Sequence, residues 1–142
     1  MTDIVVKGHK TISAGFTGEV KREKLIYDFS KDGGAYSGNV YILGTMSGAV
    51  LIEKVIVRVT TAVTSGGSAT VIVGHTDNDD CFVDATAGAV ANLTANAVAA
   101  AATTSVPLVL ASGKKITMTI GTANLTAGVI IVEIDYKDAR AA

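Results

Sequence analysis

Residues 48–74 constrain the fold most, because two strongly β-forming runs are joined there by a short segment of small residues. In the first run, Val55, Val57 and Val59 alternate with polar or charged residues, and only Ile56 interrupts the pattern. Alternation with a period of two is typical of a half-buried strand. The second run, residues 70–73, is shorter and rich in β-branched side chains.

The connection between these runs contains Gly66 and Gly67. Glycine adopts the positive φ angles that a tight hairpin turn needs, at no steric cost. β-branched residues on both sides of the connection pack well on a pleated sheet. We therefore predict a β-hairpin over residues 48–74, with its two strands paired side by side.

Further strands are predicted from short apolar or alternating runs that turn residues separate. They cover residues 25–29, 40–43, 106–110 and 116–120, and a closing strand that places Ile130, Val132, Ile134 and Tyr136 on one face. Pro107 indicates an edge strand or the start of a strand. About seven short strands with glycine-rich turns predict an all-β fold, a single jelly-roll-like β-sandwich.

The chain is expected to divide into an N-terminal arm, residues 1–24, and the sandwich, residues 25–142. The arm is inferred from Gly8, Gly15 and Gly18, from scattered charge, and from the absence of a long apolar run before residue 25. Termini that no core holds are usually mobile, but in assemblies they often become ordered against a neighbour.

Residues 85–102 are dominated by alanine. Alanine favours helix, so we predict at most one short helix, over residues 86–93, with Asp84 or Thr86 as its cap. Residues 94–104 have small side chains and are predicted to form a long connection. Such a segment is suited to lying against a neighbouring subunit.

The composition disfavours several classes of partner. Hydrophobic residues make up 49% of the chain and charged residues 18%, but no apolar run reaches the roughly 18 residues that a membrane-spanning helix needs. The net charge of -1 provides no field that attracts nucleic acid or an anionic membrane. We therefore expect neither partner. A chain this apolar is expected to bury part of its own surface in an assembly. A plain β-rich monomer is the alternative.

Cys81 is the single cysteine, so it has no partner for an internal disulfide. The N-terminus lacks the residue order of a secretory signal, and synthesis in a reducing cytoplasm is expected. The neighbouring Asp79, Asp80 and Asp84 are expected to raise the pKa of the thiol, whereas a reactive cysteine needs a lowered pKa. We therefore do not assign Cys81 a catalytic role.

Residues 75–80 are the most polar stretch and follow directly after a predicted strand. Asp77, Asp79 and Asp80 supply hard oxygen ligands and are weak candidates for a calcium site. An EF-hand loop needs glycine at its sixth position and glutamate at its twelfth, and counting from Asp77 these are Phe82 and Gly88. A solvated turn is the favoured interpretation. An irregular calcium site that another loop or subunit completes remains the alternative.

The sequence shows no catalytic constellation. His9 and His75 do not have the spacing of a transition-metal site. Ser65, Ser68 and Ser112 lie in predicted turns, and no histidine is near them in sequence. We therefore predict no enzymatic activity, no catalytic residue and no cofactor.

Three segments carry a resemblance to a known group. They read, in chain order, GAVLIEKVIVRVTTA, GGSATVIVGHTDNDDCFVDATA and KITMTIGTANLTAGVIIVEIDY. Together they span most of residues 47–137 and resemble the small β-sandwich virion proteins of tailed bacteriophages, the capsid decoration (cement) and head-fibre group. His75 and Cys81 depart from the simpler pattern of that group.

The resemblance implies a non-enzymatic virion protein that binds the outer surface of the major capsid protein shell and stabilises it. It also implies a homo-oligomer, with a trimer expected, and a location on the capsid surface after synthesis in the host cytoplasm. Residues 1–24 would be the capsid-binding arm. The alternative function is a tail-fibre or host-surface module that binds glycan through sandwich loops, but only 5% of residues are aromatic and none is tryptophan.

Overall fold

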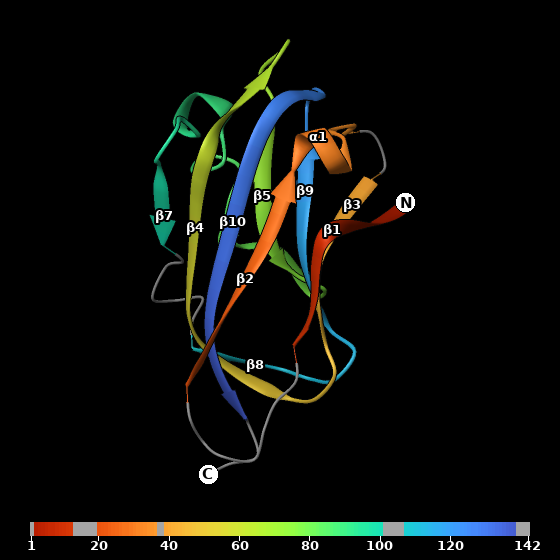
Figure 1. The fold of residues 1–142 in the computed structure, drawn as a ribbon, viewed down its shortest axis with the longest axis vertical. Coiled ribbons are helices and arrows are strands. Elements are labelled where there is room, and N and C mark those ends of the chain that lie inside the picture. Colours follow the sequence, from red (N-terminus) through yellow and green to blue (C-terminus); the bar gives the residue numbers. More distant parts are fainter. Residues whose placement is uncertain (1, 13–19, 37–38, 101–106, 139–142) are drawn as a thin grey trace.

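The computed structural model describes residues 2–12, 20–36, 39–100 and 107–138. Nearly every element in these ranges is a strand, so the all-β prediction is confirmed (Figure 1). The elements are β1 (Thr2–Ile12), β2 (Lys21–Asp28), α1 (Phe29–Asp32), β3 (Asn39–Met46), β4 (Val50–Ser65), β5 (Thr70–His75), β6 (Asn78–Val83), η1 (Val90–Asn92), β7 (Val98–Ala100), β8 (Leu108–Leu110), β9 (Lys115–Gly121) and β10 (Leu125–Asp138).

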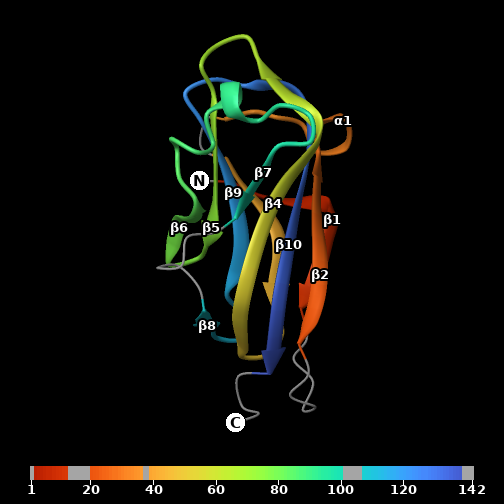
Figure 2. The ribbon, with the colours of Figure 1, turned by 90° about the vertical axis from the view of Figure 1, so that its left-hand side faces the viewer.

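The strands form one curled sheet in the order β6-β5-β9-β3-β1-β2-β10-β4-β7, and β8 pairs with β4 beside this path. We call β6, β5, β9 and β3 layer A, and β2, β10, β4, β7 and β8 layer B. Strand β1 joins the layers, because it pairs in parallel with β3 and meets β2 only where Gly8 lies opposite Ile26. The curl places the layers face to face, as the predicted sandwich requires (Figure 2).

The core lies between the two layers and is filled by alternate side chains of the strands. In β10, Ile130, Val132 and Ile134 are buried, as predicted. Tyr27 of β2 and Tyr41 of β3 meet across the core with their ring centroids 5.6 Å apart and their planes at 77°. This edge-to-face geometry is favourable for aromatic rings, so the pair links layer B to layer A.

The predicted hairpin over residues 48–74 is wrong. Both strands exist, but β4 pairs with β10, β7 and β8, whereas β5 pairs with β6 and β9. The connection therefore crosses from layer B to layer A, and neither Gly66 nor Gly67 has a positive φ angle. Alternation shows which face of a strand is buried, and the same valines are buried whether two strands lie side by side or face each other across a core.

The predicted boundary between an arm and the sandwich at residue 24 does not match the structure in residues 2–12. These residues form β1, which lies inside the sheet, and its Val6 and Ile12 are buried in the core. The pairing of β1 with β3 shifts register between Val5 and Lys10. This irregularity interrupts the alternation that would have identified the strand. Residues 13–19 of the expected arm lie outside the described residues.

The predicted helix over residues 86–93 is also wrong. Asp84 accepts a hydrogen bond from the N–H of Ala87, as a helix cap does, but only the short η1 turn follows. The backbone at Gly88 instead accepts a hydrogen bond from the N–H of Val71 at 2.7 Å, so this segment pairs with β5. The described chain has its single turn of α-helix at α1, where Asp28 caps the N-terminus by accepting from the N–H of Ser30.

Candidate functional site

The acidic residues lie at the tip of a hairpin formed by β5 and β6. His75 pairs with Asn78, which leaves two residues in the turn between them. The carboxylate of Asp77 lies 3.1 Å from Nζ of Lys114, at the start of the chain that enters β9. The stretch interpreted as a solvated turn therefore contains an exposed tight turn, residues 76–77, and continues as the edge strand β6.

The structure does not bring the calcium candidates together. Asp77 is paired with a lysine, and Asp79 and Asp80 are exposed on β6. Within the described ranges, no three His, Cys, Asp or Glu side chains are placed to hold a metal ion. Charges on an edge strand discourage pairing with the sheet of another molecule, and this is the effect that the structure supports for Asp79 and Asp80.

Cys81 is half-buried on β6. Burial raises the pKa of its thiol to about 11, and the negative charges of Asp80 and Asp79 add to the increase. The sequence predicted the direction of this shift from the aspartates, but burial is its larger cause. A thiol with this pKa stays protonated near neutral pH and is a poor nucleophile.

His75 lies beside Phe82, with their ring centroids 5.9 Å apart. Burial lowers the pKa of His75 below the ordinary value of 6.5. The unfolded chain therefore binds a proton at this position more readily than the folded chain does. The contribution of His75 to stability is present above pH 6.5 and is lost as the pH falls below that value.

We expect the free energy of unfolding to decrease between pH 7.5 and pH 5.5 and the variant His75→Gln to show a shallower decrease. Glutamine stays neutral over this range, so it removes the proton uptake on unfolding. Urea unfolding midpoints of the two proteins, measured at several pH values, test this expectation. An equal slope for both proteins would show that His75 does not cause the pH dependence.

Ser65 has a structural role in the connection between β4 and β5. Its hydroxyl donates to the carbonyl of Asn124 at 2.7 Å and accepts from the N–H of Gly67 at 3.1 Å. These bonds close the connection against the chain that leads into β10. The side chain of the other histidine, His9, lies 3.0 Å from the hydroxyl of Thr45, between β1 and β3.

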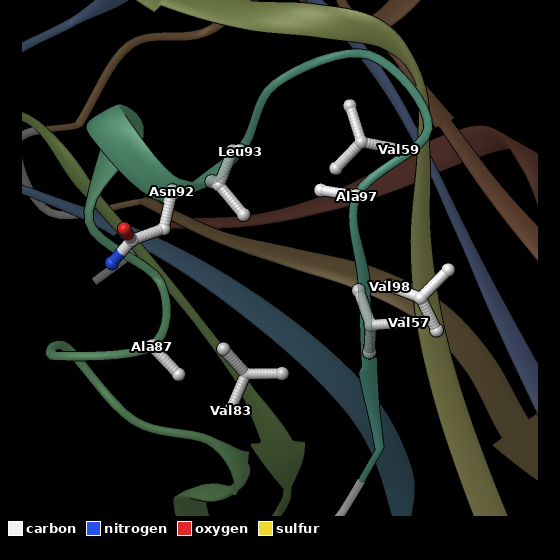
Figure 3. A pocket seen from close by; sticks show the side chains of 8 residues that line it. All are labelled: Val57, Val59, Val83, Ala87, Asn92, Leu93, Ala97 and Val98. Atoms are coloured by element: carbon white, nitrogen blue, oxygen red, sulfur yellow. The ribbon is translucent and has the colours of Figure 1, made fainter.

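An apolar groove lies where the curled sheet fails to close. Strands β6 and β7 are the two ends of the strand order, and the groove runs between them. Figure 3 shows Val83 and Ala87 on one side of the groove and Val57 and Val98 on the other. Its volume is about 220 Å³, and it is lined by Val57, Val59, Val83, Ala87, Asn92, Leu93, Ala97 and Val98. We call it the seam groove.

The segment that closes one end of the seam groove is anchored by its backbone. The N–H of Val63 donates to the carbonyl of Leu93 at 3.0 Å, and the N–H of Val59 donates to that of Ala97 at 2.9 Å. The groove is smaller than the roughly 300–1,000 Å³ of typical small-molecule sites, and Asn92 is its one polar lining residue. These properties suit the side chains of a docking protein better than a substrate.

One long segment of the chain beside the seam groove contains no charged residue. Residues 85–113 contain no Asp, Glu, Lys or Arg, which makes them the longest uncharged run in the chain. They include η1, β7 and β8, and the last two pair with the same outer edge of β4. Val98 is 67% exposed on β7, and Val109 is 60% exposed on β8. We call the described part of this run, residues 85–100 and 107–113, the uncharged flank.

The same fold occurs in the capsids of phages. A chain of the capsid of Ralstonia phage GP4 aligns with a TM-score of 0.63 at 16% identity, over 91% of this chain and 98% of that one. A chain of the cyanophage Pam1 capsid asymmetric unit aligns with a TM-score of 0.61 at 17% identity, over 87% and 88%. The capsid of Helicobacter pylori bacteriophage KHP30 gives 0.50 at 18% identity, over 82% and 86%.

These likenesses confirm the fold of the predicted resemblance, that of a β-rich phage virion protein. At this level of identity they rest on shape alone. No protein-family model matches the sequence, and no curated protein matches it. No helix in the described ranges is long and apolar enough to span a membrane.

The sequence does not single out the residues that make the seam groove, because Val57, Val59 and Val83 have the pattern of ordinary core positions in a strand. Only the three-dimensional arrangement shows that they line the gap between β6 and β7. One sequence signal was available, since the small, uncharged residues 94–104 were predicted to suit a neighbouring subunit. Of these, residues 101–104 lie outside the described residues.

Proposed function

We propose that this chain is a non-enzymatic structural protein of a tailed-phage virion that decorates the outer surface of the capsid. It binds the shell of major capsid protein and stabilises it, as a homotrimer. The likeness of nearly the whole chain to capsid chains of two phages, at TM-scores of 0.61 and 0.63, is the observation that carries the proposal.

The described sites support this proposal because they provide apolar surface for contact with another protein and few reactive groups. The seam groove has no titratable lining residue, and the thiol of Cys81 stays protonated at neutral pH. A protein that binds a shell in many copies gains strength from avidity, so each contact need only be modest. The glycan-binding alternative gains no support, since Tyr36 is the one exposed aromatic side chain in the described ranges.

Residues 1–24 are the proposed capsid-binding region. In its described part, Val5 on β1 is 61% exposed and Val20, just before β2, is 53% exposed. Both are apolar side chains that a flat protein partner would cover. The region belongs to the sheet in residues 2–12, so it would present a rigid surface there.

Capsids prepared without this protein test the proposal by co-sedimentation. The wild-type protein is expected to pellet with them to a saturating stoichiometry that divides evenly into the capsid symmetry. The variant Val5→Asp is expected to bind at least about tenfold more weakly, because a carboxylate would have to be desolvated in the contact. Unchanged binding of Val5→Asp would contradict the assignment to residues 1–24, and no binding of the wild type would contradict the function.

A further inference from the structure

The uncharged flank follows one edge of layer B. Strand β8 pairs with Val50–Ile52 of β4 and β7 pairs with Ile56–Arg58, so both short strands lie along the same side of β4. In each of them an exposed valine projects from the surface, Val98 or Val109. The two valines therefore lie along the same edge of β4.

The flank also has a depression beside its projections. Val98 is at once exposed and part of the wall of the seam groove, whose floor is made by the buried Val57 and Val59. Burying a valine side chain is favourable relative to leaving it in water. Covering the projecting valines and the apolar depression with a matching surface therefore lowers the free energy.

The other described surfaces of layer B carry charge. On its outer face, Arg22 forms an ion pair with Asp135 at 2.7 Å, and Arg58 forms one with Glu133 at 2.7 Å. These hydrogen bonds hold the pKa values of both carboxyl groups below their ordinary values, so the groups stay ionised. Covering this face with a second protein would require all four charges to be desolvated.

The free edge of layer A is charged as well. Strand β6 exposes Asp79 and Asp80 beside Asp77 of the turn. Two copies of the chain that met along this edge would bring carboxylates of like charge together. Close contact between copies is therefore disfavoured at β6 and over the ion pairs on the outer face of layer B. The uncharged flank contributes no charge of its own, and Arg58, which lies opposite Val98, is already paired with Glu133.

We propose that the uncharged flank is the surface through which copies of this chain associate with one another. Charge complementarity favours a second copy as the occupant, because a surface without charge matches itself without like-charge repulsion. The net charge of -1 means that long-range repulsion between copies is also small. In a homotrimer the subunits meet head to tail, so two different parts of the surface face each other at every interface. A flank whose residues carry no charge avoids like-charge repulsion whichever of its parts meet.

The proposal does not depend on capsid binding, so the experiment uses the full chain alone in solution. Light scattering coupled to size-exclusion chromatography gives the mass of the wild type over a range of concentrations. The variants Val98→Asp and Val109→Asp are expected to raise the dissociation constant of self-association at least about tenfold, since each would bury an unpaired carboxylate. The matched control is Val5→Asp, an equally exposed valine on β1, which is expected to keep the wild-type mass.

Thermal unfolding of each variant shows whether it is folded. If Val98→Asp fails to fold because it borders the seam groove, Val109→Asp decides the outcome by itself. Dissociation by the flank variants with an intact Val5→Asp oligomer supports the proposal. A wild type that is monomeric at the highest concentration would overturn it, and so would flank variants that keep the wild-type mass. A monomer that still pellets with capsids would overturn this inference together with the proposed homotrimer, and would leave the proposed capsid binding in place.

Discussion

Replacing Gly88 by alanine is expected to lower the free energy of unfolding by about 3 kcal/mol or more, at the upper end of overpacking effects. A Cβ atom at this position would overlap the carbonyl oxygen of Val71. The carbonyl of Gly88 accepts a hydrogen bond from the N–H of Val71 at 2.7 Å, so the two backbones are held at close range. The chain has to move away from β5 to make room, and that movement breaks the bond.

The effect of Gly88→Ala is expected to extend to the seam groove, because Ala87, Asn92 and Leu93 of the same segment line it. The matched control is Gly66→Ala. At Gly66 an added Cβ would meet no atom within 4 Å, and φ is not positive. Alanine there is expected to be neutral or to stabilise by up to about 1 kcal/mol, by restricting the unfolded chain.

Urea unfolding monitored by circular dichroism measures both glycine variants under the same conditions. A loss of stability in Gly88→Ala that is no larger than the change in Gly66→Ala would contradict the close approach of residue 88 to β5. It would also remove the argument that this segment is held rigidly over the groove.

Replacing Ile134 by alanine is expected to destabilise the protein by about 2–5 kcal/mol. Ile134 has no exposed surface and lies on β10, which pairs with β2 on one side and β4 on the other. Neighbours on both sides restrict collapse around a smaller side chain, so the variant loses both the burial of the removed atoms and the packing around them. Chemical denaturation gives the difference in the free energy of unfolding from the wild type.

The control for this variant lies on the same strand. Ile131 faces the opposite side of β10 and is only partly buried, so Ile131→Ala removes the same atoms from a less enclosed site. We expect it to cost clearly less than Ile134→Ala. Equal costs would mean that β10 does not separate a core face from an outer face at these positions.

The faces of the long strands were predictable from the sequence. In β10 the spacing of Ile130, Val132 and Ile134, with Glu133 and Asp135 on the opposite face, identified the buried face correctly. In β4 the positions of Val55 and Val57 did the same. A period of two is a local property of the sequence. It is visible in any strand that has one solvent-exposed face and one buried face.

The partners of those strands were not predictable in the same way. The connection from β4 to β5, at Gly66 and Gly67, has the composition of a hairpin turn but joins the two layers. Which strands pair is decided by how all of them share one core, and a two-strand pattern contains no information about it. The strand β1 was missed for a related reason, since its register shift near Gly8 and its glycine content obscure the alternation.

For the site, the sequence directed attention to residues with chemistry, Asp77, Asp79 and Asp80, because donor atoms are visible in a sequence. The structure separates their roles, with Asp77 paired to Lys114. An apolar contact surface such as the seam groove arises because the two edge strands, β6 and β7, do not pair with each other. Its residues have no individual signature, so only their lack of charge could be noticed in advance.

The central proposal is that this chain binds a phage capsid from outside. The most direct measurement is the binding of the purified protein to phage capsids prepared without it. Co-sedimentation at increasing concentrations, with the thermal stability of the capsids recorded in parallel, gives both occupancy and effect. We predict saturable binding at a stoichiometry set by the capsid symmetry, and capsids that withstand a higher temperature when occupied. Protein that stays in the supernatant at all concentrations, with capsid stability unchanged, would contradict the claim.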